Sequence, residues 1–324
     1  MNLGTTRVKT EITAKPKVRP NKSAFAAIIG RPSVGKSTLL NRLCGAKAAI
    51  VSPVPQTTRN SIRGIVNRPE GQIVFVDTPG MHISGKKLNL RLLETAARAL
   101  DEADIALYVL DASRPPGPEE DAVIKVLERR DGAASQKTVA AINKIDAADS
   151  AAAAISDNYL KERLPLLPSE RVFYISALRN EGIDAMLACM FRLAPEGPAL
   201  YGKDCYTDQE PAFRIAEIVR EKAMNRLREE LPHSIYVDVA DMELRSSGTG
   251  KTACQTLWVR AFIMAERESQ KGMIVGKGGS MIRSIRLAAL RDLKKVFDWK
   301  IELDLRVKTA QDWRGNDAIL KKLV

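Results

Sequence analysis

The sequence predicts an α/β chain of two domains, in which a mostly parallel β-sheet covered by helices precedes a smaller α+β domain. Its 324 residues are enough for about two domains of ~150 residues each. Short apolar runs alternate with helical patterns over the first two thirds, which is typical of a parallel sheet covered by helices. The stretch between Pro195 and Pro211, rich in Pro, Gly and charge, indicates a linker. Beyond it the expected order changes to α-β-β-α-α-β.

The first domain contains apolar runs that resemble strands buried on both faces. These runs are Ala24–Ile29, Ile73–Val76, Ile105–Leu110, Thr138–Ile142 and Val172–Ile175. Ser61–Asn67 alternates more loosely, as an edge strand does. The intervening helical patterns are Leu90–Leu100, Glu119–Arg130 and Ile183–Leu193.

The second domain is expected to begin with a helix and to pass through a helix–turn–helix. Its segments are a helix over Phe213–Glu230, strands over His233–Leu244 and Gln255–Glu266, a turn at Gly276–Gly279, a strand over Lys300–Val307 and a closing helix. We therefore expect a basic flexible arm over 1–22, a first domain over 23–195, a linker over 196–211 and a second domain over 212–324.

The amino-acid composition disfavours some classes of protein and indicates the kind of partner. Hydrophobic residues make up 45% and charged residues 28%, which disfavours a disordered chain, and no apolar run is long enough for a transmembrane span. The net charge of +12 indicates a polyanionic partner. The arm lacks the apolar core of a secretory signal. The four cysteines form no CxxC pair, which favours a reduced, cytoplasmic compartment and inert thiols.

A phosphate-binding loop follows the first strand. The sequence GRPSVGKS fits G-x-x-x-x-G-K-[ST], in which glycines let backbone N–H groups point at phosphate oxygens. Lys36 is expected to reach the β- and γ-phosphates, and the Ser37 hydroxyl to bind Mg²⁺. The expected nucleotide contacts here are Gly30, Arg31, Pro32, Ser33, Val34, Gly35, Lys36, Ser37 and Thr38. A second GKT, at 250–252, lacks the first glycine and is expected to be a hairpin loop.

Two further segments point to the phosphates. Asp77, Thr78, Pro79 and Gly80 end a strand, where the acid can hold a water on Mg²⁺ and the Gly80 N–H can bond the γ-phosphate. One threonine of Pro55–Arg59 should close over Mg²⁺. We favour Thr58, although spacing cannot separate it from Thr57. This assigns Ser37, Thr58 and Asp77 to the metal, and Lys36 and Thr58 to catalysis.

The base is expected to be guanine. Asn143, Lys144 and Asp146 follow a buried strand, and a carboxylate there accepts both the N1–H and the 2-amino hydrogens of guanine. Asn143 would tie this segment to the phosphate loop, and the Lys144 stem would cover a ring face. Ser176 and Ala177 would present a backbone N–H to guanine O6. These elements occur in the order of a P-loop GTPase.

The residue after Gly80 is Met81, which cannot orient an attacking water as glutamine does in many GTPases. We therefore expect weak intrinsic hydrolysis, with His82 as a secondary candidate for the base.

In the second domain, Gly276-Lys277-Gly278-Gly279 matches the GxxG loop of a prokaryotic-type KH domain. Seven basic residues and one acidic residue lie between Lys271 and Lys295, where an RNA backbone would pass. The expected RNA contacts are Ile274, Val275, Gly276, Lys277, Gly278, Gly279, Arg283 and Arg286. Met281, Ile282 and Ile285 are expected to help line an apolar groove for bases. Trp313 is expected to pack the domain closed.

The motifs GRPSVGKST, PQTTR, DTPGMH, NKID, SALRNEG and IVGKGG together resemble the Era family of bacterial ribosome-assembly GTPases, over nearly all of residues 23–315. The resemblance implies GTP binding with Mg²⁺, slow hydrolysis, recognition of 16S ribosomal RNA near its 3′ end in 30S subunit assembly, and peripheral contact with the inner membrane. It also implies a class of GTPases with a hydrophobic residue after the DTPG motif. We expect a monomer and no DNA partner.

Two alternatives remain open. One is a signalling or membrane-surface GTPase whose second domain binds protein or lipid, which the GxxG loop and its basic helix disfavour. The other is a metabolic NTPase, which is disfavoured because the sequence offers no second catalytic pocket.

Overall fold

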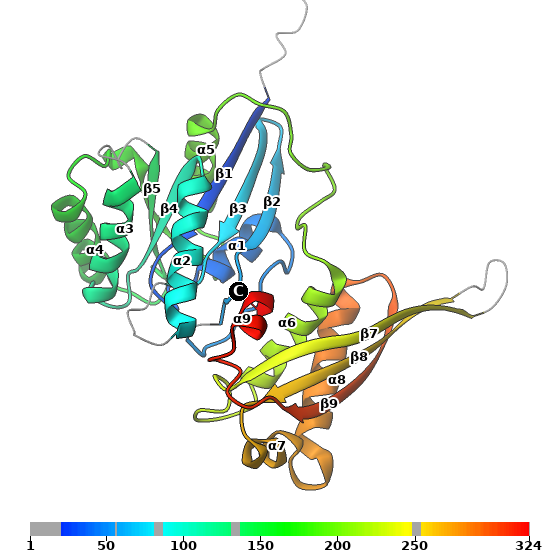
Figure 1. Cartoon of the computed structure of the whole chain (residues 1–324). Coiled ribbons are helices and arrows are strands. Elements are labelled where there is room, and N and C mark those ends of the chain that lie inside the picture. Colours follow the sequence, from blue (N-terminus) through cyan, green and yellow to red (C-terminus); the bar gives the residue numbers. More distant parts are fainter. Residues whose placement is uncertain (1–20, 56, 81–86, 131–136, 248–253, 324) are drawn as a thin grey trace, which may run out of the picture.

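The computed structural model of the chain describes residues 21–55, 57–80, 87–130, 137–247 and 254–323. Almost all of the expected basic arm, Met81, His82 and the second GKT lie outside these ranges. Figure 1 shows two bodies, each built around its own sheet, joined by an extended linker.

The first sheet has six strands in the order β2-β3-β1-β4-β5-β6. All neighbours are parallel except β2, which pairs antiparallel with β3 at the edge, as expected of Ser61–Asn67. The strands are β1 (Lys22–Ile29), β2 (Ile62–Arg68), β3 (Gly71–Asp77), β4 (Ile105–Asp111), β5 (Thr138–Asn143) and β6 (Val172–Ile175). The predicted mostly parallel sheet is therefore confirmed.

Helices cover both faces of this sheet because neighbouring strand residues point to opposite sides. Ile28 packs with α1 and α5, whereas Ile29 packs with α2, α3 and α4. The helices are α1 (Lys36–Cys44), α2 (Lys87–Glu102), α3 (Pro118–Arg130), α4 (Ser150–Arg163) and α5 (Ile183–Leu193), with a 3₁₀ turn, η1 (Ser169–Arg171). Parallel strands bring all their carboxyl ends to one edge, and the phosphate loop lies there.

The second sheet has three strands in the order β7-β8-β9. β7 and β8 are antiparallel, and β8 and β9 are parallel. The elements are α6 (Pro211–Met224), β7 (Ile235–Ser247), β8 (Cys254–Ala265), α7 (Glu268–Val275), the 3₁₀ turn η3 (Lys277–Gly279), α8 (Ser280–Val296), β9 (Lys300–Thr309) and α9 (Asp317–Leu323). The predicted α-β-β-α-α-β order is confirmed, and α6 and α8 cover one face (Figure 1).

Candidate functional site

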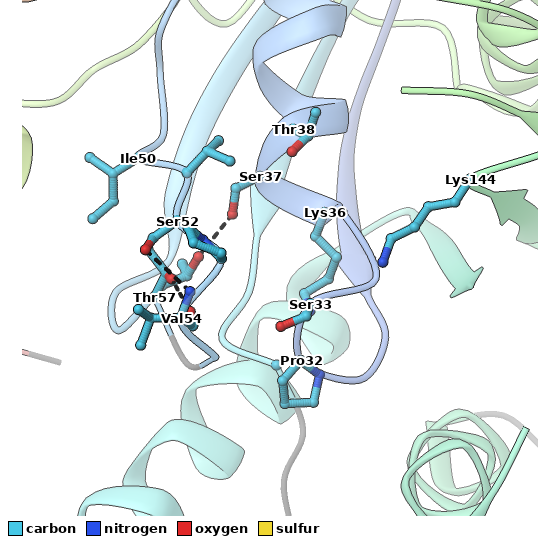
Figure 2. Close-up of a pocket in the computed structure, with 15 residues that line it drawn as sticks. Pro32, Ser33, Lys36, Ser37, Thr38, Ile50, Ser52, Val54, Thr57 and Lys144 are labelled. Carbon is cyan, nitrogen blue, oxygen red and sulfur yellow. Dashed lines mark hydrogen bonds between the residues drawn. The ribbon is translucent and has the colours of Figure 1, made fainter. Parts of the chain in front are cut away.

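The loop between β1 and α1 borders a cavity of about 320 Å³. Figure 2 shows the loop curling beneath the first turn of α1, so that the amino end of the helix faces the cavity. Such an end attracts anions because its first N–H groups are unpaired and the helix dipole is positive there. The lining residues are Pro32, Ser33, Gly35, Lys36, Ser37, Thr38, Ile50, Val51, Ser52, Pro53, Val54, Thr57, Thr58, Gly80 and Lys144.

Gly35 is required by the loop for two reasons. Its φ of 100° lies in the left-handed region, and a Cβ there would sit 2.5 Å from Asn143 Nδ2. The position therefore lets the phosphate loop and the Asn143 segment approach closely.

The Lys36 side chain folds back over the phosphate loop and contacts its first two residues. Its Nζ donates hydrogen bonds to the carbonyls of Gly30 (3.0 Å) and Arg31 (2.9 Å). Burial lowers the pKa of Lys36 to about 8, and the negative charges of Asp77 and Glu119 limit the decrease. An additional anion in the cavity would favour the charged form.

The three expected metal ligands lie together. Ser37 Oγ donates to Asp77 Oδ2 at 2.6 Å, and the Ser37 and Thr58 hydroxyl oxygens are 2.9 Å apart. Asp77 Oδ1 is buried and, within the described parts of the chain, has no hydrogen-bond partner. Burial raises the pKa of Asp77 to about 6, while Lys36 and the two hydroxyls oppose the rise. This oxygen set, with one buried carboxylate oxygen unpaired, fits a hard cation such as Mg²⁺.

The hydroxyl groups of Thr57 and Thr58 have different partners. Thr58 Oγ1 lies 3.4 Å from Asp77 Oδ2, whereas Thr57 Oγ1 donates to the Val54 carbonyl at 2.6 Å. The structure therefore brings Thr58, and not Thr57, to the expected metal ligands.

The expected guanine segments meet beside the phosphate loop. Asn143 Nδ2 donates to the Val34 carbonyl at 2.8 Å, so the segment is tied to the phosphate loop. Ser176 Oγ donates to Asp146 Oδ1 at 2.5 Å, which orients that carboxylate.

The two amides expected to face guanine O6 are already paired within the protein. The N–H of Ser176 already donates to the Glu181 carbonyl (3.1 Å), and the N–H of Ala177 donates to Asn143 Oδ1 (2.9 Å). Neither amide is therefore unused, and guanine O6 would have to share one of them. The physical reason is that buried backbone amides are paired within the protein.

A buried ionic network behind the loop was missed by sequence reasoning. Arg31 Nε lies 2.9 Å from Glu120 Oε1, and Arg31 Nη2 lies 3.7 Å from Asp111 Oδ2. Lys144 Nζ donates to Asp111 Oδ2 at 2.6 Å. Burial raises the pKa of Asp111, but hydrogen bonds from Lys144 and Ser113 outweigh it and leave the pKa below its usual value. The available signal was that β4, like β3, ends in an aspartate.

The GxxG loop lies between α7 and α8, where the expected turn was placed. Gly276 has a φ of 74°, and a Cβ there would lie 2.7 Å from the Met281 Cβ. Lys277 and Gly278 are exposed, as is Arg283 on the first turns of α8. Arg286 Nε donates to the Leu303 carbonyl at 2.6 Å, so part of its guanidinium is bound to β9.

Two expected groove residues are wrong as surface contacts. Ile274 and Ile285 are fully buried in the core of the second domain. Their apolar side chains pack between the helices and the sheet, which removes them from any bound base. Val275, Met281 and Ile282 are only partly buried.

Trp313 closes the second domain, as predicted. It is fully buried, its Nε1 donates to the Ser234 carbonyl at 3.0 Å, and its ring meets Tyr236 edge-on with centroids 5.1 Å apart. The prediction from sequence missed that Arg59 of the first domain lies over this ring at 5.1 Å.

The fold and site define a P-loop GTPase that carries a KH domain. A family model described as "50S ribosome-binding GTPase" matches residues 25–144, and a KH domain model matches residues 230–314. The "GTPase Era" of Treponema denticola is 49% identical over 301 residues, which cover 93% of this chain and 99% of that protein. The chain belongs to the Era family of GTPases.

Other relatives agree. The "GTPase Era" of Treponema pallidum (strain Nichols) is 46% identical over 321 residues, covering 94% of this chain and 97% of that one. An Aquifex aeolicus Era variant bound to GDP·AlF4⁻ has a TM-score of 0.84 at 32% identity, with 93% of this chain and 98% of that chain covered. Era in complex with MgGDPNP and nucleotides 1506–1542 of 16S ribosomal RNA has a TM-score of 0.85 at 32% identity, with coverages of 94% and 98%. Among the helices described here, none has the length and hydropathy needed to cross a membrane.

Proposed function

We propose that this chain is a GTP-controlled switch that binds 16S ribosomal RNA near its 3′ end and acts in assembly of the 30S ribosomal subunit. The observation that carries the proposal is that one chain contains a phosphate-loop cavity and an exposed GxxG loop beside a basic helix. The Era relative in complex with MgGDPNP and a 16S ribosomal RNA fragment supports it, because that chain aligns with 94% of this one.

In the GTP site, Lys36 binds the β- and γ-phosphates and Asp146 binds the guanine edge. Ser37, Thr58 and Asp77 hold Mg²⁺, which when bound neutralises charge on the phosphates. Thr58 lies on a loop, so its position can depend on the γ-phosphate. Hydrolysis is slow because Met81, which lies outside the described residues, cannot orient a water.

In the RNA site, the backbone of Gly276–Gly279 approaches phosphates closely, and exposed Lys277 and Arg283 supply charge. Val275 with Met281 and Ile282 is the apolar surface left for bases, since Ile274 and Ile285 belong to the core. Arg286 contributes through the guanidinium nitrogens that do not contact Leu303.

The finer features follow from the resemblance. We propose Mg²⁺ as the cofactor, a monomer in the cytoplasm with peripheral contact to the inner membrane, and no DNA partner. We also propose a basic arm over 1–22, a GTPase domain over 23–195, a linker over 196–211 and a KH domain over 212–324.

The test is crosslinking of the full chain to RNA in cells, followed by sequencing, with GTP-loaded and GDP-loaded protein compared in extract. We expect crosslinks concentrated near the 3′ end of 16S ribosomal RNA, in different amounts for the two nucleotides. Crosslinks spread over unrelated RNAs, or binding to vesicles that nuclease does not affect, would instead support the signalling alternative.

A further inference from the structure

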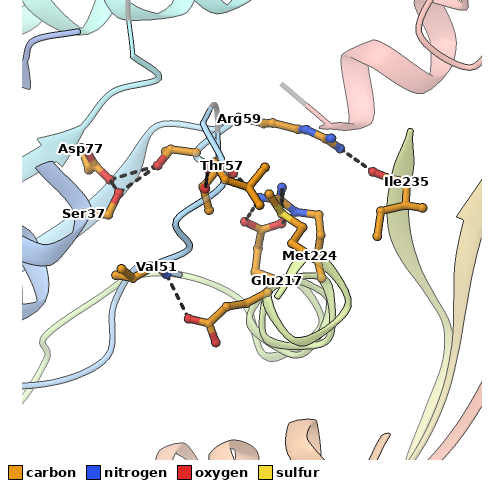
Figure 3. A network of polar contacts seen from close by, with 12 residues as sticks. Ser37, Val51, Thr57, Arg59, Asp77, Glu217, Met224 and Ile235 are labelled. Atoms are coloured by element: carbon orange, nitrogen blue, oxygen red, sulfur yellow. Dashed lines mark hydrogen bonds and ion pairs between the residues drawn. The ribbon is translucent and has the colours of Figure 1, made fainter. Parts of the chain in front are cut away.

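The second domain forms hydrogen bonds on both sides of Thr58, on the loop between α1 and β2. Arg220, on α6, donates from Nη2 to the Thr57 carbonyl at 2.5 Å. On the other side of Thr58, Arg59 donates from Nη1 to the Ile235 carbonyl of β7 at 2.9 Å. Figure 3 shows the segment at Thr57 and Arg59, with the bond from Arg59 to Ile235 on one side and Ser37 and Asp77 on the other.

The Arg220 anchor is rigid. Its side chain is 2% exposed, and Glu217 binds the guanidinium through two hydrogen bonds of 2.7 and 2.6 Å. A guanidinium held by a carboxylate fork has a fixed plane, so the second N–H of Nη2 also points in a fixed direction. That direction is the Thr57 carbonyl.

The Arg59 anchor is also built into the second domain. The side chain is buried, and its guanidinium stacks on the Trp313 ring in addition to bonding the Ile235 carbonyl. Stacking on an aromatic face adds a second constraint on the same cation.

These contacts restrain Thr58 from both sides. The Thr57 carbonyl belongs to the planar peptide that enters Thr58, and the next residue, Arg59, has its guanidinium held in the second domain. The Thr58 hydroxyl is 2.9 Å from that of Ser37 in this arrangement.

We propose that Arg220 and Arg59 are positioning residues for Thr58, so that the KH domain completes the metal site of the GTPase domain. The inference rests on the proposed function, in which Thr58 binds Mg²⁺. Docking of the second domain then tightens Mg²⁺–GTP, and displacement of that domain loosens it.

A matched control exists at the end of the same helix, where Asn225 is the C-cap residue of α6. Asn225 Oδ1 accepts a hydrogen bond from Ser52 Oγ at 2.7 Å and so holds an earlier part of the same loop, away from Thr58. If α6 merely stabilised the interface, loss of this contact would act like loss of the Arg220 contact.

The experiment compares the full chain with Arg220→Met/Glu217→Gln, which removes the buried pair without leaving an unpaired charge, and with Asn225→Ala. In nucleotide-free protein, hydrogen exchange at residues 57–60 should be about tenfold faster in the double variant only. The Mg²⁺ concentration that half-saturates tight binding of fluorescent GDPNP should rise by roughly 5- to 100-fold, with GDP affinity nearly unchanged.

The inference would be overturned if the double variant kept the hydrogen-exchange rate and the Mg²⁺ dependence of the parent. It would also be overturned if Asn225→Ala changed both quantities as much as the double variant does. If the double variant does not fold, Arg59→Lys must show the same two changes, because it keeps the charge but loses the planar guanidinium that bonds the Ile235 carbonyl and stacks on Trp313. Thr58→Ala separates failure of the proposed function from failure of the positioning inference. If Thr58→Ala leaves the Mg²⁺ dependence unchanged, the proposed role of Thr58 fails. If Thr58→Ala changes the Mg²⁺ dependence but the Arg220 and Arg59 variants do not, only the positioning inference fails.

Discussion

Single polar side chains set the chemistry of the nucleotide site, because each is oriented by one or two close partners. Asp146 illustrates this, since Ser176 binds one carboxylate oxygen. Asp146→Asn replaces an acceptor with a donor that faces the donors of guanine. We expect GTP affinity to fall by at least about tenfold and xanthosine triphosphate, whose O2 is an acceptor, to be preferred. Competition binding with both nucleotides checks this, and unchanged GTP affinity would refute the assignment.

Lys36 is the principal charge in the phosphate loop. Lys36→Ala removes this charge from the β- and γ-phosphate positions and should weaken triphosphate binding by roughly 10- to 100-fold, with turnover lost. RNA binding by the second domain should persist, since its core is separate. Calorimetric titration with GDPNP measures the first effect, and an undiminished affinity would contradict the role of Lys36.

Asp111 is the residue whose importance only the structure revealed. Asp111→Asn keeps the shape of the side chain but leaves Lys144 and Arg31 without this carboxylate. Because Lys144 is about one third exposed, solvent moderates the cost, and we expect a loss of about 1–3 kcal/mol in the free energy of unfolding. Denaturant unfolding of the parent and variant measures it, and equal stability would show that the network is not structural.

At the scale of elements, α6 contacts the first domain through a cluster of charges. Lys47 Nζ lies 2.6 Å from Glu221 and 2.8 Å from Asp292, and Lys222 lies 2.5 Å from Asp292. Burial raises the pKa of Asp292, but hydrogen bonds from Lys222 and Lys47 outweigh this and lower it from 3.8 to about 2.

A carboxylate with a lowered folded pKa stabilises the fold above its unfolded pKa and loses that contribution as the pH falls through the folded value. The advantage of the parent over Asp292→Asn should therefore be full above pH 3.8 and should vanish towards pH 2. Unfolding of both proteins across this range tests it, and a difference that does not depend on pH would contradict the ion-pair account.

The elements themselves could largely be predicted from the sequence, because buried parallel strands are continuous apolar runs. Val172–Ile175 and Ile183–Leu193 agree with the structure at both ends. α4 was missed because it buries only Ser156 and Leu160, so its alanine-rich sequence has no apolar stripe. α6 ends at Met224, earlier than the predicted Glu230. Asn225 is its C-cap, and the apolar pattern continues past it because Leu227, in the segment that follows, is also buried.

The candidate site was less predictable where tertiary contacts decide which side chains lie in it. The motifs located the phosphate loop and Asp77, but spacing could not separate Thr57 from Thr58. The sequence pattern also could not reveal that the Arg59 guanidinium lies over the Trp313 ring, because the two residues belong to different domains. The burial of Ile274 and Ile285 follows from how α7 and α8 pack on the sheet, which no local pattern specifies.

For the whole molecule, the GxxG loop is the point at which RNA binding can be removed without touching the GTP site. Changing Lys277 and Gly278 both to Asp places negative side chains on an exposed loop that faces phosphates in the proposed complex. RNA affinity should fall severely and the slope of log affinity against log salt should flatten, while GDPNP affinity stays unchanged. Retained RNA affinity would favour a protein- or lipid-binding second domain.

The central claim is that nucleotide state and RNA binding are coupled in one chain. The most direct measurement is the affinity of the full chain for an oligonucleotide of the 16S ribosomal RNA 3′ end, titrated with saturating Mg²⁺–GDPNP and with saturating Mg²⁺–GDP at one salt concentration. The account predicts affinities that differ by about fivefold or more, with the same ratio recovered when nucleotide affinity is measured with and without RNA. Equal RNA affinity in the two states would contradict it.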